Sequence, residues 1–493
     1  MAVRTVTRRI VIVGSGTAGL INALLLRRAF PDDRITVVSS SDIGIVGVGE
    51  GSTEHWRWFM DVCEIPVAEL LVRTSATHKL GIRFKDWTTH TPDYFHSIST
   101  TFPMNPFGAM LLYNGLNADG KLLTQSISSR SLVEGRVSAD RPHDSVNQFH
   151  FDTFKLNEYF VALCVARNIQ MVEGTVSSVN TSPTDGWVES VVLGDGSTVE
   201  GNFFLDATGF RRVLCSAVGN TRWVGYEDYL PMNSAIAFPT PHPEDGRIWS
   251  FTWARAMRNG WSWEIPTQER RGNGYVFSDA FTTEDEAVAE MSALVGMDVE
   301  PARTFRFRSG YLRDQWTKNV VAVGLASSFV EPLEATSIGS TIQQARSLCL
   351  NLATFRRGDT AIPARHNGDM ALMMENILAM IFLHYMTDRT DTEFWASRAA
   401  TKPPVLLAEL LELWRERPPT ERDVPTNGFE MFHAPHFWHV AQGQGLIPRD
   451  RSAMAVASYG MTEAVSREIW EVKKRQTDHP TVDHLESLRA LSR

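Results

Sequence analysis

The segment "RIVIVGSGTAGLINALLLRRAF" near the start of the chain limits the possible folds more than any other stretch. Its first residues are β-branched and end at a glycine, which predicts a buried parallel strand over residues 9–14. A turn with the spacing G-x-G-x-x-G follows, and apolar residues at helical spacing come directly after it. "RITVVSS" then has the composition of a second strand. The segment therefore predicts a βαβ unit.

The glycines of this turn predict a site for a dinucleotide. Gly14 permits the turn, Gly16 lets the backbone approach a pyrophosphate, and Gly19 allows the helix to pack closely on the strand. The amides of Thr17 and Ala18 lie at the positive end of the helix dipole and favour phosphate groups. A tight βα turn that binds nothing is the alternative.

Later parts of the chain indicate that the dinucleotide is FAD. Two further glycine turns follow predicted strands, in "DATGF" at residues 206–210 and in "VAVGLASSFVEPLE" at residues 321–334. FAD proteins of the hydroxylase type commonly have both turns, whereas a nicotinamide dehydrogenase has no need of them. Only one G-x-G-x-x-G motif is present, so we expect another protein to reduce the flavin. Ser39 replaces the acid that usually binds the ribose at the end of the second strand, and its hydroxyl can still form a hydrogen bond there.

These elements predict an α/β fold. It comprises a Rossmann-type FAD-binding module of the GR2, hydroxylase-like class, inserted substrate segments and a mostly helical C-terminal subdomain. "WVESVVLGDGSTVEGNFFLDATGF" predicts a hairpin and then a strand, and the pattern becomes helical from about residue 368. We expect the FAD module at residues 1–90, 150–225 and 305–365, substrate and barrier segments at 91–149 and 226–304, and the helical substrate-covering part at 366–493.

The composition excludes several classes of function. A net charge of −9 argues against a nucleic-acid binder, because phosphate neutralisation needs a basic face. The four cysteines are scattered without a C-x-x-C pair, as in a reducing compartment. The apolar run before Gly14 is too short for a signal peptide, and "ALMMENILAMIFLHYM" is interrupted by Glu375 and Asn376, as in a buried helix. We expect a cytoplasmic protein that does not enter a membrane.

Three histidines in "FHAPHFWHV" invite a metal interpretation. His433, His436 and His439 are spaced to share a helix face, but Pro435 disturbs a helix through the first pair. No acidic group that could support metal ligands is evident nearby. The pattern favours packing or substrate-lid histidines, and we expect no metal.

Two tryptophans in "NGWSWEIPTQ", Trp261 and Trp263, raise the question of what they cover. Residues two apart in a strand project from the same face, so both indoles lie on one surface. Taken alone, the pair is explained at least as well by an ordinary hydrophobic core.

Four blocks together resemble the flavin-dependent tryptophan halogenase family. They are "HKLGIRFKDW" around Lys79, "WSWEIP", "FVEPLEATS" around Glu334, and "FLHYMTDRTDTEFW", and they occur in the family's order. The resemblance extends from the glycine turn to about residue 450, which is most of the chain.

The resemblance implies a role for each block. Trp261 and Trp263 would form a barrier between flavin and substrate, and Lys79 would hold hypohalous acid by a hydrogen bond or as a haloamine. Glu334 would stabilise the cationic ring intermediate and remove its proton. Without the family, the lysine would be a surface charge and the glutamate a helix N-terminal acid.

The resemblance also implies how halide and flavin are held. The family's S-T-G is Ala335-Thr336-Ser337 here, and the amides of Thr336 and Ser337 would bind the halide. The loss of glycine is expected to constrain this loop, so bromide becomes an alternative to chloride. Further flavin contacts are implied at Gly49, Glu50, Gly324, Pro332 and Leu333.

The substrate pocket departs from that of relatives that act on free tryptophan. Those relatives clamp the amino-acid end with a Tyr-Tyr pair, and no tyrosine lies between Tyr385 and Tyr459. "MNPFG" resembles the family's H-x-F-G segment with asparagine in place of histidine. We therefore expect an electron-rich, indole-type aromatic rather than free tryptophan. Candidate pocket residues are Asn105, Phe107, Phe437 and Trp438, the last two being equally consistent with core packing.

The expected function is an FADH2- and O2-dependent halogenase that chlorinates or brominates this aromatic. A separate NAD(P)H-dependent flavin reductase would supply the FADH2, and the sequence leaves open whether two copies form a homodimer. The alternatives are a flavin-dependent aromatic hydroxylase and a flavin-binding sensor or scaffold without chemistry. The presence of both Lys79 and Glu334 favours the halogenase.

Overall fold

The structure is a computed structural model. It describes residues 7–41, 43–44, 50–91, 93–97, 114–115, 117–118, 135–139, 143, 147–244, 246–417, 419–420, 422–478 and 480–491.

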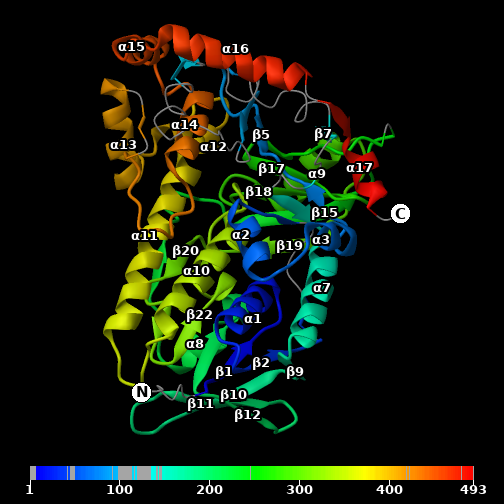
Figure 1. Ribbon diagram of the computed structural model, residues 1–493, viewed down its shortest axis with the longest axis vertical. Helices are drawn as coiled ribbons and strands as arrows, with labels where there is room; N and C mark the ends of the chain where they lie inside the picture. The colour runs from blue at the N-terminus through cyan, green and yellow to red at the C-terminus, as the bar shows by residue number, and fades with distance from the viewer. Residues whose placement is uncertain are drawn as a thin grey trace.

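The βαβ unit predicted from the N-terminal segment is present and lies inside a six-stranded sheet (Figure 1). Strand β1 (Arg9–Val13) is buried between two parallel neighbours, β2 (Arg34–Ser39) and β13 (Phe203–Asp206). The helix between β1 and β2 is α1 (Thr17–Ala29), and its apolar face packs on the sheet. The sheet order is β21-β22-β13-β1-β2-β9, with β9 at Gln170–Glu173, β21 at Trp316–Thr317 and β22 at Val320–Ala322.

Both faces of this sheet are covered. On one face α1 packs against α7 (Thr153–Ala166) and α10 (Thr336–Leu352) around a large apolar core. The predicted hairpin covers the other face as part of a separate three-stranded sheet. That sheet contains β10 (Val176–Thr181), β11 (Val188–Leu193) and β12 (Thr198–Glu200), and α8 (Val213–Ala217) lies beside it.

A second, seven-stranded sheet carries the two tryptophans. Its order is β19-β15-β18-β17-β16-β5-β6, and every pair is antiparallel except β16 with β5. All seven residues of the central β17 (Gly260–Pro266) are buried. Helix α9 (Glu284–Val295) covers the outer face of this seven-stranded sheet. The other strands are β5 (Ile82–Lys85), β6 (Asp93–His96), β15 (Ser234–Thr240), β16 (Thr252–Met257), β18 (Arg271–Phe277) and β19 (Arg303–Arg306).

Short elements join the two large sheets. Strands β3 (Glu50–Gly51), β8 (Phe149–Phe151) and β4 (Thr77–His78) form one small sheet. A second contains β14 (Trp223–Gly225), β20 (Gly310–Leu312) and β23 (Ser328–Phe329). Helices α2 (His55–Val62) and α3 (Val67–Arg73) follow β3.

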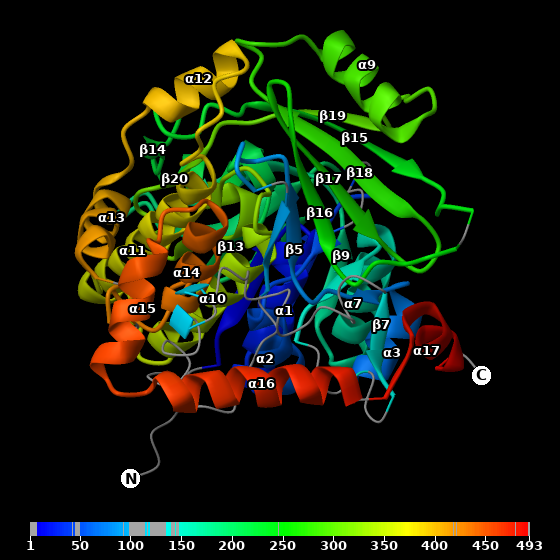
Figure 2. The ribbon, with the colours of Figure 1, turned by 90° about the horizontal axis from the view of Figure 1, so that it is seen from above.

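The C-terminal part is helical, as the sequence predicts, although its first long helix begins several residues before position 368. Figure 2 shows α11 to α15 gathered on one side of the molecule, α16 lying along an edge, and α17 on the opposite side. Among the described residues, no helix combines the length and the apolarity needed to cross a lipid bilayer. The helices are α11 (Ala361–His384), α12 (Glu393–Ala400), α13 (Val405–Glu416), α14 (Ala434–Gly443), α15 (Arg449–Ser458), α16 (Thr462–Asp478) and α17 (His484–Ala490), and β24 (Thr481–Asp483) pairs with β7 (Arg136–Ser138).

Candidate active site

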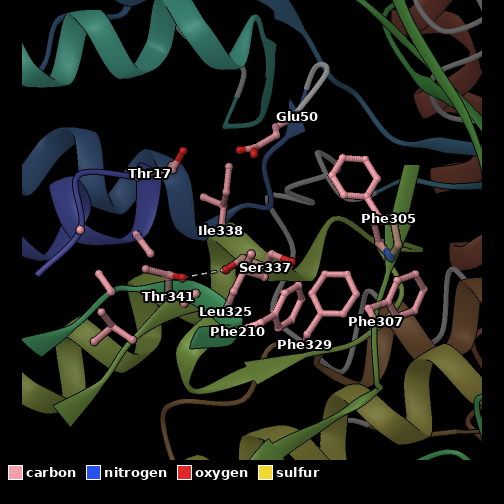
Figure 3. Close-up of a pocket in the computed structure, with 18 of the residues that line it drawn as sticks. Thr17, Glu50, Phe210, Phe305, Phe307, Leu325, Phe329, Ser337, Ile338 and Thr341 are labelled. Atoms are coloured by element: carbon pink, nitrogen blue, oxygen red, sulfur yellow. Dashed lines mark hydrogen bonds between the residues drawn. The ribbon is translucent and has the colours of Figure 1, made fainter. Parts of the chain in front are cut away.

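A cavity of about 420 Å³ connects the glycine turn of the first sheet with the tryptophan strand of the second. Figure 3 shows Thr17 and Glu50 on one side of this space and the rings of Phe210, Phe305 and Phe329 on another. The cavity brings together most of the residues singled out in the sequence. These are Gly14, Gly16, Thr17, Ala18, Glu50, Lys79, Trp261, Trp263, Gly324, Pro332, Leu333, Glu334 and Ser337.

The glycine turn has the shape that a bound pyrophosphate requires. A Cβ on Gly14, whose φ is +114°, would lie 2.3 Å from the carbonyl oxygen of Ala207. A Cβ on Gly19 would lie 2.0 Å from the carbonyl oxygen of Gly14, so this glycine allows the helix to approach the turn. A Cβ on Gly16 would meet nothing within 4 Å. The open space at Gly16, next to the amides of the first turn of α1, fits the phosphates of FAD.

A carboxylate from another strand lies beside Ser39, the residue predicted to contact the ribose. Ser39 ends β2 directly beside Glu173, which ends the neighbouring strand β9. The Glu173 carboxylate accepts hydrogen bonds from the Ser41 amide (2.7 Å), the Ser41 hydroxyl (2.8 Å) and the Ser39 hydroxyl (3.4 Å). The hydrogen bonds from Ser41 lower the pKa of Glu173. An ionised acid therefore stands at this edge of the sheet although the expected position is a serine.

Lys79 is a buried lysine with a defined hydrogen bond. Its exposed fraction is 0%, and its Nζ donates to the carbonyl oxygen of Ser52 at 2.8 Å. A Cβ on Gly51 would lie 3.5 Å from this Nζ, an ordinary van der Waals distance, so Gly51 lies directly against the lysine. Burial lowers the pKa of Lys79 to about 8, while the charge of Glu334 acts to raise it. The ammonium can therefore lose its proton near neutral pH.

Glu334 lies just before α10, and only one of its oxygens is bound by histidines. Oε1 accepts hydrogen bonds from His96 Nδ1 and from His384 Nε2, both at 2.8 Å. Oε2 is buried and has no hydrogen-bond partner within the described part of the chain. Burial acts to raise the pKa of Glu334, but His96 and His384 hold it well below its usual range. The arrangement is an ionised carboxylate with one oxygen still available at the wall of the cavity.

The two tryptophans stand on the same face of β17, as predicted. Their ring centroids are 6.1 Å apart, and their exposed fractions are 2% for Trp261 and 9% for Trp263. Trp261 Nε1 donates to Glu331 Oε2 at 3.0 Å, and the Tyr385 hydroxyl donates to the same oxygen at 2.8 Å. A Cβ on Gly274 would lie 2.1 Å from the Trp263 ring, so this glycine on β18 accommodates the indole. The indoles thus belong to the core and also form part of the cavity wall.

Thr336 and Ser337 are the first two residues of α10. Amides of a first helical turn have no partner inside the helix, and the helix dipole adds positive potential there. The left-handed residues are instead Glu334, with φ of 86°, and Ala335, with φ of 53°. The expectation that the missing glycine constrains the loop at Ser337 is therefore wrong, because Ser337 has helical backbone.

A family model described as tryptophan halogenase matches residues 9–459. The chain belongs to the tryptophan halogenase family. Tryptophan 6-halogenase SttH of Streptomyces toxytricini is 31% identical, with 92% of this chain and 93% of that protein covered. Tryptophan 7-halogenase RebH of Lentzea aerocolonigenes is 29% identical, with 95% of each chain covered. The solved structure of a flavin-dependent halogenase from Xanthomonas campestris aligns with a TM-score of 0.84, at 30% identity and 99% coverage of both chains.

Membership of the tryptophan halogenase family makes the chain a flavin-dependent halogenase, a class of enzyme that works with a separate flavin reductase. The predicted α/β fold is confirmed by the agreement with these structures.

Among the described residues, Phe437 and Trp438 do not line the cavity. Gly49, Asn105 and Phe107 lie outside the described residues. Phe437 and Trp438 on α14 are fully buried in the apolar core, which is the alternative that the sequence left open. Phe437 packs against Trp414 of α13, with ring centroids 6.4 Å apart.

The structure also brings in residues that the sequence reasoning missed. His96 and His384 contact Glu334, Glu331 holds Trp261, and Ser52 binds Lys79. His384 and Glu331 lie inside blocks that carry the family resemblance, but the resemblance assigns no role to either residue. No group of three or more histidine, cysteine or acidic side chains in the described ranges is arranged to hold a metal ion.

Proposed function

We propose that the chain uses FADH2 and O2 to chlorinate or brominate an electron-rich, indole-type aromatic, with hypohalous acid guided to Lys79. The observation that carries this proposal is the cavity itself. It begins at the glycine turn, passes Trp261 and Trp263, and contains both Lys79 and Glu334.

The FAD would lie along the glycine turn and the segments that face it. Gly14, Gly16 and Gly19 shape the turn, and the amides of Thr17 and Ala18 face the phosphates. Bound as FADH2, the flavin would give two electrons to O2, and the halide would give two more to the same oxygen as it is oxidised to the level of hypohalous acid. Further contacts would come from Ser39, Glu50, Gly324, Pro332 and Leu333.

Glu50 can face the phosphates without repelling them. Burial raises its pKa to about 7, so a neutral carboxyl group that donates a hydrogen bond is accessible. The side chain lies in the same space as Thr17 (Figure 3).

Lys79 and Glu334 would divide the halogen transfer between them. Lys79 holds hypohalous acid, either as an ammonium that donates a hydrogen bond or as a neutral amine that takes the halogen. The aromatic carbon attacks the halogen, and Glu334 Oε2 stabilises the cationic ring and removes its proton. His96 and His384 keep the other oxygen in place while this occurs. The amides of Thr336 and Ser337 would hold the halide ion before it is oxidised.

The substrate class follows from relatives and from one difference. The two relatives described above are named as tryptophan halogenases, which favours an indole ring. Because the chain has no tyrosine between Tyr385 and Tyr459, a Tyr-Tyr clamp for the amino-acid end is missing from that segment. We therefore favour an indole without a free amino-acid group.

Mass spectrometry of the product tests the proposal. The protein is incubated with FAD, a flavin reductase, NADH, oxygen and indole, with chloride or bromide in separate reactions. A halogen isotope pattern that disappears in Lys79→Ala and persists in Lys85→Ala is the expected result, because Lys85 is exposed. A product that has gained one oxygen instead would indicate the aromatic hydroxylase. Halogenation by Lys79→Ala at the wild-type rate would disprove the role of this lysine.

A further inference from the structure

A chain of side chains leads from the buried carboxylate Glu334 to the surface. His96 Nδ1 lies 2.8 Å from Glu334 Oε1, and His96 Nε2 lies 3.0 Å from His436 Nδ1. His436 Nε2 lies 3.5 Å from Glu54 Oε1. The exposed fractions of the side chains rise along this path from 0% at His96 and Glu334 to 9% at His436 and 27% at Glu54.

Four separate elements hold these groups in line. Glu334 precedes α10, His96 ends β6, His436 lies in the first turn of α14, and Glu54 precedes α2. Pro435 next to His436 is compatible with the start of a helix, so α14 begins at this point. In both His96 and His436, the two ring nitrogens face two different partners. This arrangement lets an imidazole accept a proton on one side and release one on the other.

Other charged and titratable groups surround this path. His384 and Lys79 face Glu334, and the ring of His439 lies 5.9 Å from that of His96. His433 and His55 lie near His436 and Glu54. Burial raises the pKa of Glu54, but His436 and the other histidines bring it down to about 2, so an anion remains at the outer end.

We propose that His96, His436 and Glu54 form a proton relay between solvent and Glu334. One hydrogen lies between each pair of neighbouring groups in the relay: Glu334 and His96, His96 and His436, and His436 and Glu54. In one arrangement these hydrogens sit on His96 Nδ1, His436 Nδ1 and His436 Nε2, so that Glu334 is ionised and His436 is a cation beside Glu54. The hydrogen between the rings then moves to His96 Nε2 as the His96 Nδ1 hydrogen moves to Glu334 Oε1. One positive charge passes inward without the turning of either ring.

Only N–H and O–H bonds break and form in this transfer, and no electrons are exchanged. The solvent supplies the proton to the His436–Glu54 pair. A half-turn of the Glu334 carboxyl group exchanges its two oxygens and presents the proton to the cavity, where it is consumed as O2 is reduced to water. Glu334 is then ionised again and can remove the ring proton. His96, His436 and Glu54 act through Glu334 and are positioning residues for the reaction.

The relay rests on the proposed function, whose stoichiometry requires a proton. FADH2, O2, a halide ion, an aromatic C–H group and one proton give FAD, the aryl halide and two waters. One proton per turnover must therefore reach a site in which Lys79 and Glu334 are both buried. A path through side chains supplies it without bulk water having to reach Lys79 or Glu334.

Single-turnover halogenation in buffers of increasing imidazole concentration tests the relay. In His436→Ala we expect the rate at low buffer to fall about 100-fold, at the lower end of what positioned proton transfer contributes. Imidazole should restore that rate to a plateau, whereas the wild-type rate should not depend on imidazole. His433→Ala is the matched control, because this neighbouring side chain is half exposed and pairs with Glu430 outside the relay.

A second variant distinguishes proton transfer by His436 from a purely structural role in hydrogen bonding. Glutamine at position 436 can form hydrogen bonds to both neighbours but cannot pass a proton. Slow turnover in His436→Gln, together with imidazole rescue in His436→Ala, supports the relay. Turnover at the wild-type rate in His436→Gln, or a slow His436→Ala that imidazole does not rescue, would overturn it.

A readout without turnover distinguishes failure of the relay from failure of the proposed function. In protein labelled with ¹⁵N-histidine, the bridging hydrogens of His96 and His436 should give downfield proton resonances. The resonances of the hydrogens that His436 shares with His96 and with Glu54 should disappear in His436→Ala and persist in His433→Ala. The hydrogen bond between His96 and Glu334 does not involve His436, so its resonance should remain in both variants. Absence of the bridging resonances from the wild-type protein would refute the relay, whereas wild-type protein that gives these resonances but no halogenated product would refute the halogenase proposal.

Discussion

Replacing Lys79 with methionine should stabilise the protein while abolishing halogenation. Burial lowers the pKa of Lys79 from 10.5 to about 8. Each pKa unit corresponds to about 1.4 kcal/mol, so the charged side chain lowers the free energy of unfolding by about 3 kcal/mol. The variant also leaves the Ser52 carbonyl oxygen without the Lys79 ammonium, which costs about 1 kcal/mol. The expected net gain near pH 7 is therefore about 2 kcal/mol.

The pH dependence identifies the cause of this gain. Between pH 8 and pH 10.5 the unfolded chain still binds the lysine proton while the folded protein has released it. Wild-type stability contributed by this group therefore rises with pH across that window and is at its lowest below pH 8. The advantage of Lys79→Met should shrink accordingly.

Urea titrations at several pH values between 7 and 10, followed by tryptophan fluorescence, measure the difference. Lys85→Met is the control. Because Lys85 is exposed, we expect this variant to have the same free energy of unfolding as the wild-type protein. A Lys79→Met protein that is less stable than wild type at pH 7 would show that the lysine is not held as a costly buried charge. An advantage that does not change with pH would refute the same reasoning.

Three further predictions follow from the backbone and from one surface acid. Gly16→Val should fold, because a Cβ there meets nothing within 4 Å, with a free energy of unfolding lowered by about 1 kcal/mol because valine is a poor N-cap for α1, yet fail to bind FAD in a fluorescence titration; retained binding would refute the pyrophosphate site. Ser337→Gly should lower the free energy of unfolding by about 1 kcal/mol, because glycine weakens a helix, and leave the chloride-to-bromide product ratio unchanged; a reversed ratio would contradict this. Glu173→Gln should weaken FAD binding about tenfold, the effect of about 1.4 kcal/mol in a hydrogen bond to a charged group, whereas Glu200→Gln should not.

The sequence was sufficient where the physical cause is local. The strand, glycine turn and helix at residues 9–29 follow from β-branching, glycine spacing and apolar periodicity, and the structure has them at those positions. The common face of Trp261 and Trp263 follows from the two-residue period of a strand. Only the family resemblance predicts that Lys79 lies in the active site, because a lysine considered by itself is most often a surface residue.

The parts of the site that the sequence did not predict depend on contacts between segments that are far apart in the chain. Glu334 and His96 are 238 positions apart, and nothing in the residues around either one indicates the other. Glu173 lies beside Ser39, the predicted ribose contact, because β9 pairs with β2, and local sequence patterns do not predict that pairing. Ser337 was judged from the glycine that it replaces, whereas the left-handed residues are the two before the helix.

The backbone at Glu334 and Ala335 has a consequence for how this enzyme can be changed. Two successive residues other than glycine lie in the left-handed region, a conformation that costs roughly 1–2 kcal/mol for each. At position 335 glycine would relieve that cost, whereas at position 334 the same change would remove the carboxylate held by His96 and His384. The gain at position 334 would be offset, because each of the two buried histidines left without an acceptor costs about 1–3 kcal/mol. A search for stable variants of this scaffold has to keep position 334 fixed and look for its gains elsewhere.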